Sequence, residues 1–315
     1  MLMLPRHPAL QFTHPLPYGA ILHDHGVQFV VFSRSATSMK VLLYDRAADL
    51  EPSARIIYNR DTDRWGDIWS VFVPHVGAGQ LYHFQAEGPF DPESGQRFDG
   101  RARLIDPYAR ALAGDFLPTP DGSVHPPKCV VVDDRFDWQG DRHLRRDLSE
   151  TVIYEMHVRG FTRSPSSGVR HPGTYLGVIE KIPYLKSLGV TAVELMPVHE
   201  FPTNGFWGEP KPLGNYWGYD PIAFFAPHRG YATSSEPGTD VVGHSGVFGR
   251  DQVPDRLRSA SDRGIQLPSR KFDPVVEVQD RWFAGSGAVH HCRQQRPRGI
   301  IETVVEDDHV RLSQA

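Results

Sequence analysis

Aromatic residues are concentrated in one short stretch of the chain, residues 204–228, which reads NGFWGEPKPLGNYWGYDPIAFFAPH. A pyranose ring presents an apolar C–H face bordered by hydroxyl groups, so flat aromatic side chains can stack on it while nearby polar groups orient it. Asp220 suits a hydrogen bond to a sugar hydroxyl, but an aspartate before a proline is equally an ordinary turn residue. The stretch is therefore compatible with a sugar-binding loop, but composition alone favours packing in the core as the role of its aromatic residues Phe206, Trp207, Tyr216, Trp217 and Tyr219.

Two strand-like runs and a helix-like run must position this loop. Residues 152–158 and 192–198 are apolar enough to be strands covered on both faces. The segment between them has apolar residues at helical spacing, although Pro183 must end one helix or begin a second. Gly189 suits a helix C-terminus. This order predicts a parallel unit that opens an α/β barrel, whose loops at the carboxyl ends of the strands carry the active site.

The first half of the chain has a different pattern. From about residue 26 to residue 86, apolar residues alternate with polar ones, as in Val27, Phe29 and Val31, and turn-forming residues separate the runs. This is typical of an all-β sandwich. We expect four segments: a β-sandwich at 14–110, a linker at 111–148, the first βα units of a barrel at 149–237, and a tail without recognisable pattern at 238–315.

Composition excludes several classes of protein. A net charge of −4 gives no sign of a nucleic-acid surface and favours an uncharged partner. The first twenty residues contain no sustained apolar run, so we expect neither a signal peptide nor a membrane span, and a cytoplasmic protein. Cys129 and Cys292 are too few for a disulfide framework and are not spaced as metal ligands. We assign no metal and no cofactor.

Several motifs in the right order resemble glycoside hydrolase family 13, in particular its glycogen-debranching and isoamylase group. In the second half these are YEMHVRGF at 154–161, VELMPV at 193–198 and NYWGY at 215–219. In that group a β-sandwich related to carbohydrate-binding module family 48 precedes the barrel. The first half resembles it in GVQFVVFS at 26–33, the Gly88-Pro89 turn, GQRF at 95–98 and DPYAR at 106–110. The resemblance covers roughly residues 14–237.

The resemblance implies a fold, a function and a site. The fold is an N-terminal immunoglobulin-like β-sandwich followed by the start of an incomplete (β/α)8 TIM barrel. The function is hydrolysis of α-1,6 branch linkages in glycogen-like α-glucans, as part of glycogen catabolism. Tyr219 is similar to the family's tyrosine that stacks under the sugar, and Trp217, Tyr216 and Asp220 are further candidates for substrate contact. His157 and Arg159 follow the first strand, where a histidine satisfied inside the barrel and a locally paired arginine are the favoured roles.

The catalytic carboxylates of the family have no counterpart in this sequence. Retaining hydrolysis needs a nucleophile and an acid about 5 to 5.5 Å apart, and the family carries them after its fourth and fifth strands, with a further aspartate after the seventh. Only two strands are recognisable here. Asp240 to His244, DVVGH, has a superficial likeness to the third strand, but no room for a helix precedes it. We therefore assign no catalytic residue and expect the chain as written to be inactive.

The recognisable pattern ends near Gly238. A reading-frame shift or truncation is the expected explanation, and a new C-terminal domain is the alternative. Three hypotheses stay open from the sequence: an incomplete copy of an α-1,6-glucosidase, a non-catalytic α-glucan-binding protein, and a degenerate product without a biochemical role.

Overall fold

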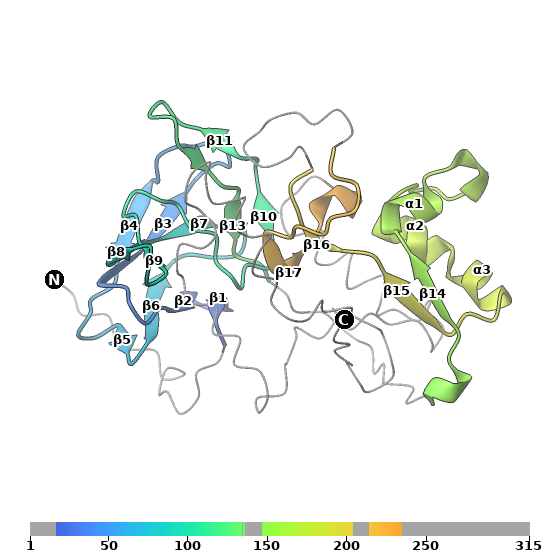
Figure 1. The fold of residues 1–315 in the computed structure, drawn as a ribbon, viewed down its shortest axis with the longest axis horizontal. Coiled ribbons are helices and arrows are strands. Elements are labelled where there is room, and N and C mark those ends of the chain that lie inside the picture. The colour runs from blue at the N-terminus through green and yellow to red at the C-terminus, as the bar shows by residue number, and fades with distance from the viewer. Residues whose placement is uncertain (1–16, 134, 136–146, 204–213, 235–315) are drawn as a thin grey trace. The chain divides into compact units, whose positions relative to one another are not determined.

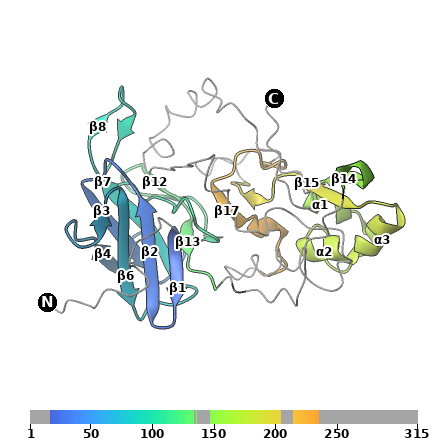
Figure 2. The same ribbon diagram turned by 90° about the horizontal axis from the view of Figure 1, so that it is seen from below.

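The computed structural model describes residues 17–133, 135, 147–203 and 214–234. It divides into two compact units, with the boundary after Asp133. Figures 1 and 2 show the first unit as strands and the second as a mixture of helices and strands. The tail that begins at residue 238 lies outside the described residues.

The first unit is built from two antiparallel sheets. One sheet has the order β1-β2-β6-β5 and the other the order β10-β13-β7-β3-β4, and Figure 2 shows strands of both. Two short pairs, β8 with β9 and β11 with β12, lie outside the two sheets. The strands of the first sheet are β1 (Gly19–His23), β2 (Gly26–Phe32), β6 (Ile68–Pro74) and β5 (Arg64–Trp65). Those of the second are β10 (Leu112–Ala113), β13 (Lys128–Val130), β7 (Leu81–Glu87), β3 (Ser38–Tyr44) and β4 (Ala54–Ile57). The short pairs are β8 (Phe90–Asp91) with β9 (Gln96–Arg97), and β11 (Leu117–Pro118) with β12 (Val124–His125).

Side chains from both sheets meet in the core of this unit. Phe29 of β2 and Tyr82 of β7 pack edge to face with ring centroids 5.0 Å apart, and the Tyr58 hydroxyl donates to the Phe29 carbonyl oxygen at 3.1 Å. Val27, Phe29 and Val31 are fully buried, as the alternation predicted. The β-sandwich is therefore confirmed. Gln28 and Val30 on the opposite face of β2 are buried as well, so this strand is covered on both faces.

Residues 111–131 differ from the expected linker. β13 pairs with β7 through Cys129 and Tyr82, and β10 pairs with β13 in turn. Leu112 and Cys129 are buried, and the buried Lys128 ammonium donates to the Ala47 carbonyl oxygen at 2.8 Å. These strands are two and three residues long, too short to show a period of two, and their pairing is with distant parts of the chain. The linker interpretation was wrong for this segment.

The second unit contains the predicted parallel unit. β14 (Ile153–Met156) and β15 (Ala192–Leu195) pair in parallel, and the crossover is two helices, α2 (Tyr175–Glu180) and α3 (Ile182–Ser187). Pro183 lies in the first turn of α3, and Gly189 follows that helix with φ +79°. Both positions agree with the sequence-based expectation. The helices α1 (Val158–Thr162), η2 (Leu148–Glu150) and η3 (Pro165–Ser167) flank this pair.

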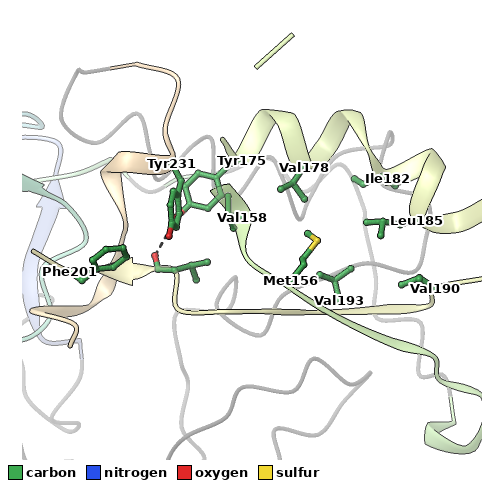
Figure 3. Close-up of a cluster of buried hydrophobic side chains, with 11 residues drawn as sticks. Met156, Val158, Tyr175, Val178, Ile182, Leu185, Val190, Val193, Phe201 and Tyr231 are labelled. Carbon is green, nitrogen blue, oxygen red and sulfur yellow. Dashed lines mark hydrogen bonds between the residues drawn. The ribbon is translucent and has the colours of Figure 1, made fainter. Parts of the chain in front are cut away.

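One hydrophobic core holds the second unit together. Figure 3 shows side chains of the strands and of α2 and α3 converging, among them Met156, Val193 and Leu185. Tyr175 and Tyr231 lie at one end of it, and the Tyr175 hydroxyl donates to the Val198 carbonyl oxygen at 3.4 Å. β14 is less covered than its apolar sequence predicted, since Ile153 and Tyr154 are 42% and 37% exposed. A run of apolar residues shows that a strand could be buried on both faces, but how much of it is buried depends on the elements that pack against it.

The segment after β15 forms a second, antiparallel pair. β16 (His199–Glu200) pairs with β17 (Ala223–Pro227), and the short helix η5 (Arg229–Tyr231) follows. Within the described residues, no helix combines the length and apolarity required to cross a membrane.

The buried His83 gives the first unit a testable response to acid. Its Nδ1 accepts from the Tyr44 hydroxyl at 3.3 Å and its Nε2–H donates to the Pro127 carbonyl oxygen at 3.0 Å. Burial lowers the pKa of His83 from 6.5 to about 3. Because the unfolded chain binds a proton that the folded chain does not, this residue's contribution to stability is present above pH 6.5 and is lost as the pH falls toward 3.

We therefore expect the urea unfolding free energy of the wild type to fall with acidification more steeply than that of His83→Gln, by up to roughly 1.4 kcal/mol per pH unit. The measurement is a series of urea titrations followed by far-ultraviolet circular dichroism from pH 7.5 downward. Parallel curves for the two proteins would contradict the assignment.

Asp106 should act in the opposite direction. It is fully buried, accepts from the Tyr82 hydroxyl at 2.7 Å and from the Tyr108 amide at 2.8 Å, and burial raises the pKa of its carboxyl from 3.8 to about 6. The folded chain holds the proton longer, so stability decreases as the pH rises from 3.8 to about 6, by roughly 3 kcal/mol in total. Asp106→Asn should lack this decrease. Unfolding free energies of both proteins at pH 4 and pH 7 test it, and an unchanged difference between them would exclude it.

Candidate functional site

Three of the aromatic residues singled out in the sequence lie together on the surface of the second unit. Tyr216, Trp217 and Tyr219 belong to the loop 214–220, between β16 and β17, and are 42%, 54% and 66% exposed. These exposures exclude the core-packing alternative for the three rings. Phe206 and Trp207 lie outside the described residues. The loop thus presents flat apolar faces to solvent, the surface that an apolar sugar face requires.

The buried His157 supports Tyr216 from below. The two rings stack with centroids 4.1 Å apart and planes 6° from parallel. The imidazole Nδ1 accepts from the Gly160 amide at 3.1 Å, so its Nε2 carries the proton and donates to the Tyr216 carbonyl oxygen at 2.8 Å. The Tyr231 hydroxyl lies 3.2 Å from the same Nε2. A histidine satisfied inside the unit, the favoured role from the sequence, is what the structure has.

Local sequence explains why His157 occupies this position. It is the N-cap of α1, where a side-chain acceptor for the Gly160 amide satisfies one of the free donors of the first turn. It follows β14 directly, so it lies at the carboxyl end of the parallel pair. A glycine at position 160 also leaves room for Tyr216 to stack on His157, because a Cβ atom there would lie 2.5 Å from the Tyr216 hydroxyl oxygen.

Asp220 is engaged inside the loop. Its carboxylate accepts from the Asn215 side-chain amide, and the Asn215 side-chain oxygen accepts from the Gly218 amide at 3.2 Å. The Asn215 amide in turn donates to the Thr203 carbonyl oxygen at 2.8 Å. Of the two roles considered for Asp220, these contacts correspond to the turn residue.

Phe201 supports the other half of the loop. Gly218 has φ +76°, a conformation that favours glycine, and a Cβ atom there would lie 2.5 Å from the Phe201 ring. The Phe201 ring also stacks on His228 with centroids 3.8 Å apart. Neither Phe201 nor His228 was singled out from the sequence. The available signal of a close approach was the glycine Gly218 between the aromatic residues Trp217 and Tyr219.

Tyr231 joins the two supports. It packs edge to face against His228 at 4.6 Å and against His157 at 5.6 Å. Burial raises the pKa of the Tyr231 hydroxyl, so it stays protonated across the ordinary pH range. The loop therefore rests on a continuous layer of buried rings rather than on mobile surface side chains.

The buried carboxylate of Glu200, in β16, already has a hydrogen bond and an ion pair with Arg229. Glu200 is 1% exposed, accepts from the Arg229 amide at 2.9 Å and lies 3.5 Å from the Arg229 Nε and from the His228 Nδ1. A carboxylate held in this way is not placed to attack or protonate a sugar. Arg159, the other residue considered at the end of the first strand, is exposed at the surface of α1. Among the described residues, histidine, cysteine and carboxylate side chains form no group of three or more that could hold a metal ion.

Comparison with known proteins gives this geometry a context. Residues 17–109 match carbohydrate-binding module 48, described as the isoamylase N-terminal domain. The chloroplastic isoamylase 1 of Oryza sativa subsp. japonica is 38% identical over 264 residues, which cover 80% of this chain and 32% of that protein. Its counterpart from Arabidopsis thaliana is 39% identical over 234 residues, which cover 70% of this chain and 30% of that protein. The chain thus spans about a third of the length of these relatives.

Solved structures agree in fold. A mutant pullulanase from Paenibacillus barengoltzii, complexed with maltotetraose, aligns with a TM-score of 0.59 at 23% sequence identity. The alignment covers 74% of this chain and 35% of the pullulanase. At this identity the likeness concerns the fold.

The close approach at Gly160 can be tested directly. The methyl group of Gly160→Ala would lie 2.5 Å from the Tyr216 hydroxyl oxygen, so the substitution should displace the Tyr216 ring from His157. The ring-current shifts of the His157 ring protons in a proton NMR spectrum should collapse toward values for free histidine. Gly77→Ala, where a Cβ atom meets nothing within 4 Å, is the control and should leave those signals in place. Unchanged His157 signals in Gly160→Ala would refute the stacking.

Proposed function

We propose that this relative of the isoamylases, whose residues 17–109 are a carbohydrate-binding module 48 domain, binds α-glucan through the loop 214–220. The proposed reaction of the complete enzyme is hydrolysis of α-1,6 branch linkages in glycogen-like α-glucans. The observation that carries the proposal is the combination of an isoamylase-like sequence over 80% of the chain with three exposed rings on a rigid support.

Three properties of the loop support sugar binding. Its rings are exposed although their apolar area would favour burial, which is typical of a ligand surface. Tyr216 stacks on His157 and the backbone at Gly218 approaches Phe201, so the loop loses little conformational entropy when a sugar stacks on it. Stacking of a sugar on these rings requires no charged group, as expected for an uncharged partner. Within the loop, Tyr219 is the most exposed ring and is proposed as the main stacking residue, with Trp217 and Tyr216 beside it.

We also propose how the chain is divided into domains. The sandwich extends through β13, and we propose that residues 149–237 are the first βα units of a (β/α)8 barrel, on the strength of the parallel pair β14 and β15 with its helical crossover. The family's nucleophile and acid have no recognisable counterpart in the sequence, so we propose that the chain as written binds α-glucan without hydrolysing it.

The substitutions Tyr219→Ala and Trp217→Ala test the proposed surface. Each should weaken maltotetraose binding about tenfold, the effect typical of an aromatic contact at the centre of a site. Isothermal titration calorimetry of the whole chain measures it. Tyr184→Ala is the matched control, because this tyrosine is 50% exposed but belongs to α3. Equal affinities of wild type, Tyr219→Ala and Trp217→Ala would exclude the loop as the sugar-binding surface.

A second candidate is that the complete protein is a non-catalytic glucan-binding protein, which the carbohydrate-binding module favours. Release of reducing ends from glycogen by the complete protein would separate this candidate from a debranching enzyme. Binding without release is the expected result for this chain; release at a rate above that of a heat-inactivated sample would contradict the proposed inactivity.

A further inference from the structure

Glu200 directly precedes Phe201, one of the two supports of the loop, and its carboxylate is buried against Arg229 and His228. Transfer of a carboxylate out of water is costly unless its oxygens are paired and hydrogen-bonded. Both oxygens of Glu200 face residues at the start of η5. One accepts from the Arg229 amide at 2.9 Å, and the other lies 3.5 Å from the Arg229 Nε and 3.5 Å from the His228 Nδ1. Glu200 therefore fixes where η5 begins relative to β16.

Its backbone reinforces this position. The Glu200 carbonyl oxygen accepts from the Ile222 amide at 2.8 Å, directly after the loop, and the His228 amide donates to the Val198 carbonyl oxygen at 2.7 Å. One residue thus ties together the strand before the loop, the chain that leaves the loop and the start of η5.

The two supports of the loop both depend on η5. Phe201, which lies under Gly218, stacks on His228 with planes 11° from parallel. His157, which lies under Tyr216, is contacted by the hydroxyl of Tyr231, the last residue of η5. A shift of η5 would therefore move both supports.

We propose that Glu200 is a positioning residue for α-glucan binding: its hydrogen bond to the Arg229 amide and its ion pair with the Arg229 guanidinium, beside His228, hold η5, and η5 sets the orientation of the exposed aromatic face through Phe201 and Tyr231. This inference rests on the proposed function for its ligand, but its structural half does not need a ligand. Glu200 itself touches no sugar, and its effect is transmitted by contacts between buried rings.

The test uses the whole chain with Glu200→Gln, which keeps the length of the side chain and an acceptor for the Arg229 amide but removes the charge. Glu180 offers a matched control in the same unit, because its carboxylate also accepts from an arginine amide, that of Arg170 at 3.0 Å, and lies 3.5 Å from the Arg170 Nε. Glu180→Gln thus removes a carboxylate charge that has the same kinds of arginine contact, at the end of α2 and distant in sequence from the loop.

Two readouts separate this inference from the proposed function. The first needs no sugar: 5-fluorotryptophan is incorporated, the ¹⁹F resonance of Trp217 is assigned by Trp217→Phe, and its shift is compared between variants. Glu200→Gln should move or broaden this resonance and Glu180→Gln should not. The second is maltotetraose affinity, which Glu200→Gln should reduce about fivefold, as is typical of residues that act through a neighbour, with no change in Glu180→Gln.

Each outcome decides the matter. A wild type that binds no maltotetraose would overturn the proposed function, and the ¹⁹F shift would still decide whether Glu200 positions the loop. An unmoved Trp217 resonance in Glu200→Gln, or an equal movement in Glu180→Gln, would overturn the inference. If Glu200→Gln does not fold, Phe201→Leu replaces it, since this variant removes the stacked ring but leaves the contacts of Glu200 with Arg229. The same displacement of Trp217 is then expected, and its absence would overturn the inference.

Discussion

The imidazole of His157 is the interaction on which the exposed aromatic face depends. It connects its own helix start with residues 59 and 74 positions further along the chain. A buried imidazole must have both nitrogens satisfied, and here the Gly160 amide determines which nitrogen carries the proton. The remaining N–H then has one direction in which to donate, toward the Tyr216 carbonyl oxygen. The hydrogen bond that holds Tyr216 is thus a consequence of a helix cap, a local feature of the end of β14.

The first unit also contains buried polar side chains whose hydrogen bonds must be satisfied. Three ionisable side chains, His83, Asp106 and Lys128, are buried in or beside its second sheet, and each has specific partners. Pairing of this kind favours one register of the strands, since any slip would leave the same groups unsatisfied. It also explains why residues 111–131 belong to the sandwich: Lys128 and Cys129 bring polar contacts with Ala47 and Asp106 that a free linker would lack.

Tyrosines in the second unit have two distinct roles, and the surroundings assign them. Tyr175 and Tyr231 are almost fully buried in or beside the core, whereas Tyr216 and Tyr219 face solvent. Their side chains are identical, so composition could not distinguish a buried core tyrosine from an exposed one. Two glycines in the sequence indicate where rings pack closely. Gly218 and Gly160 allow the side chains of Phe201 and Tyr216 to approach the backbone more closely than any other residue would.

The sequence by itself determined the two halves of the chain, the β-sandwich, the strand, helix, strand order, the break at Pro183 and the concentration of aromatic residues at 204–228. These features depend on local periodicity and on residues with restricted backbone angles, which a linear pattern records directly. Only the tertiary structure decided that β10 and β13 join the second sheet, that β14 leaves part of its apolar surface exposed, that Asp220 is held by Asn215, and that His157, Phe201 and Tyr231 form one support under the loop. Each of these depends on contacts between residues far apart in the chain, and such contacts are set by which polar groups can be satisfied together when the core closes.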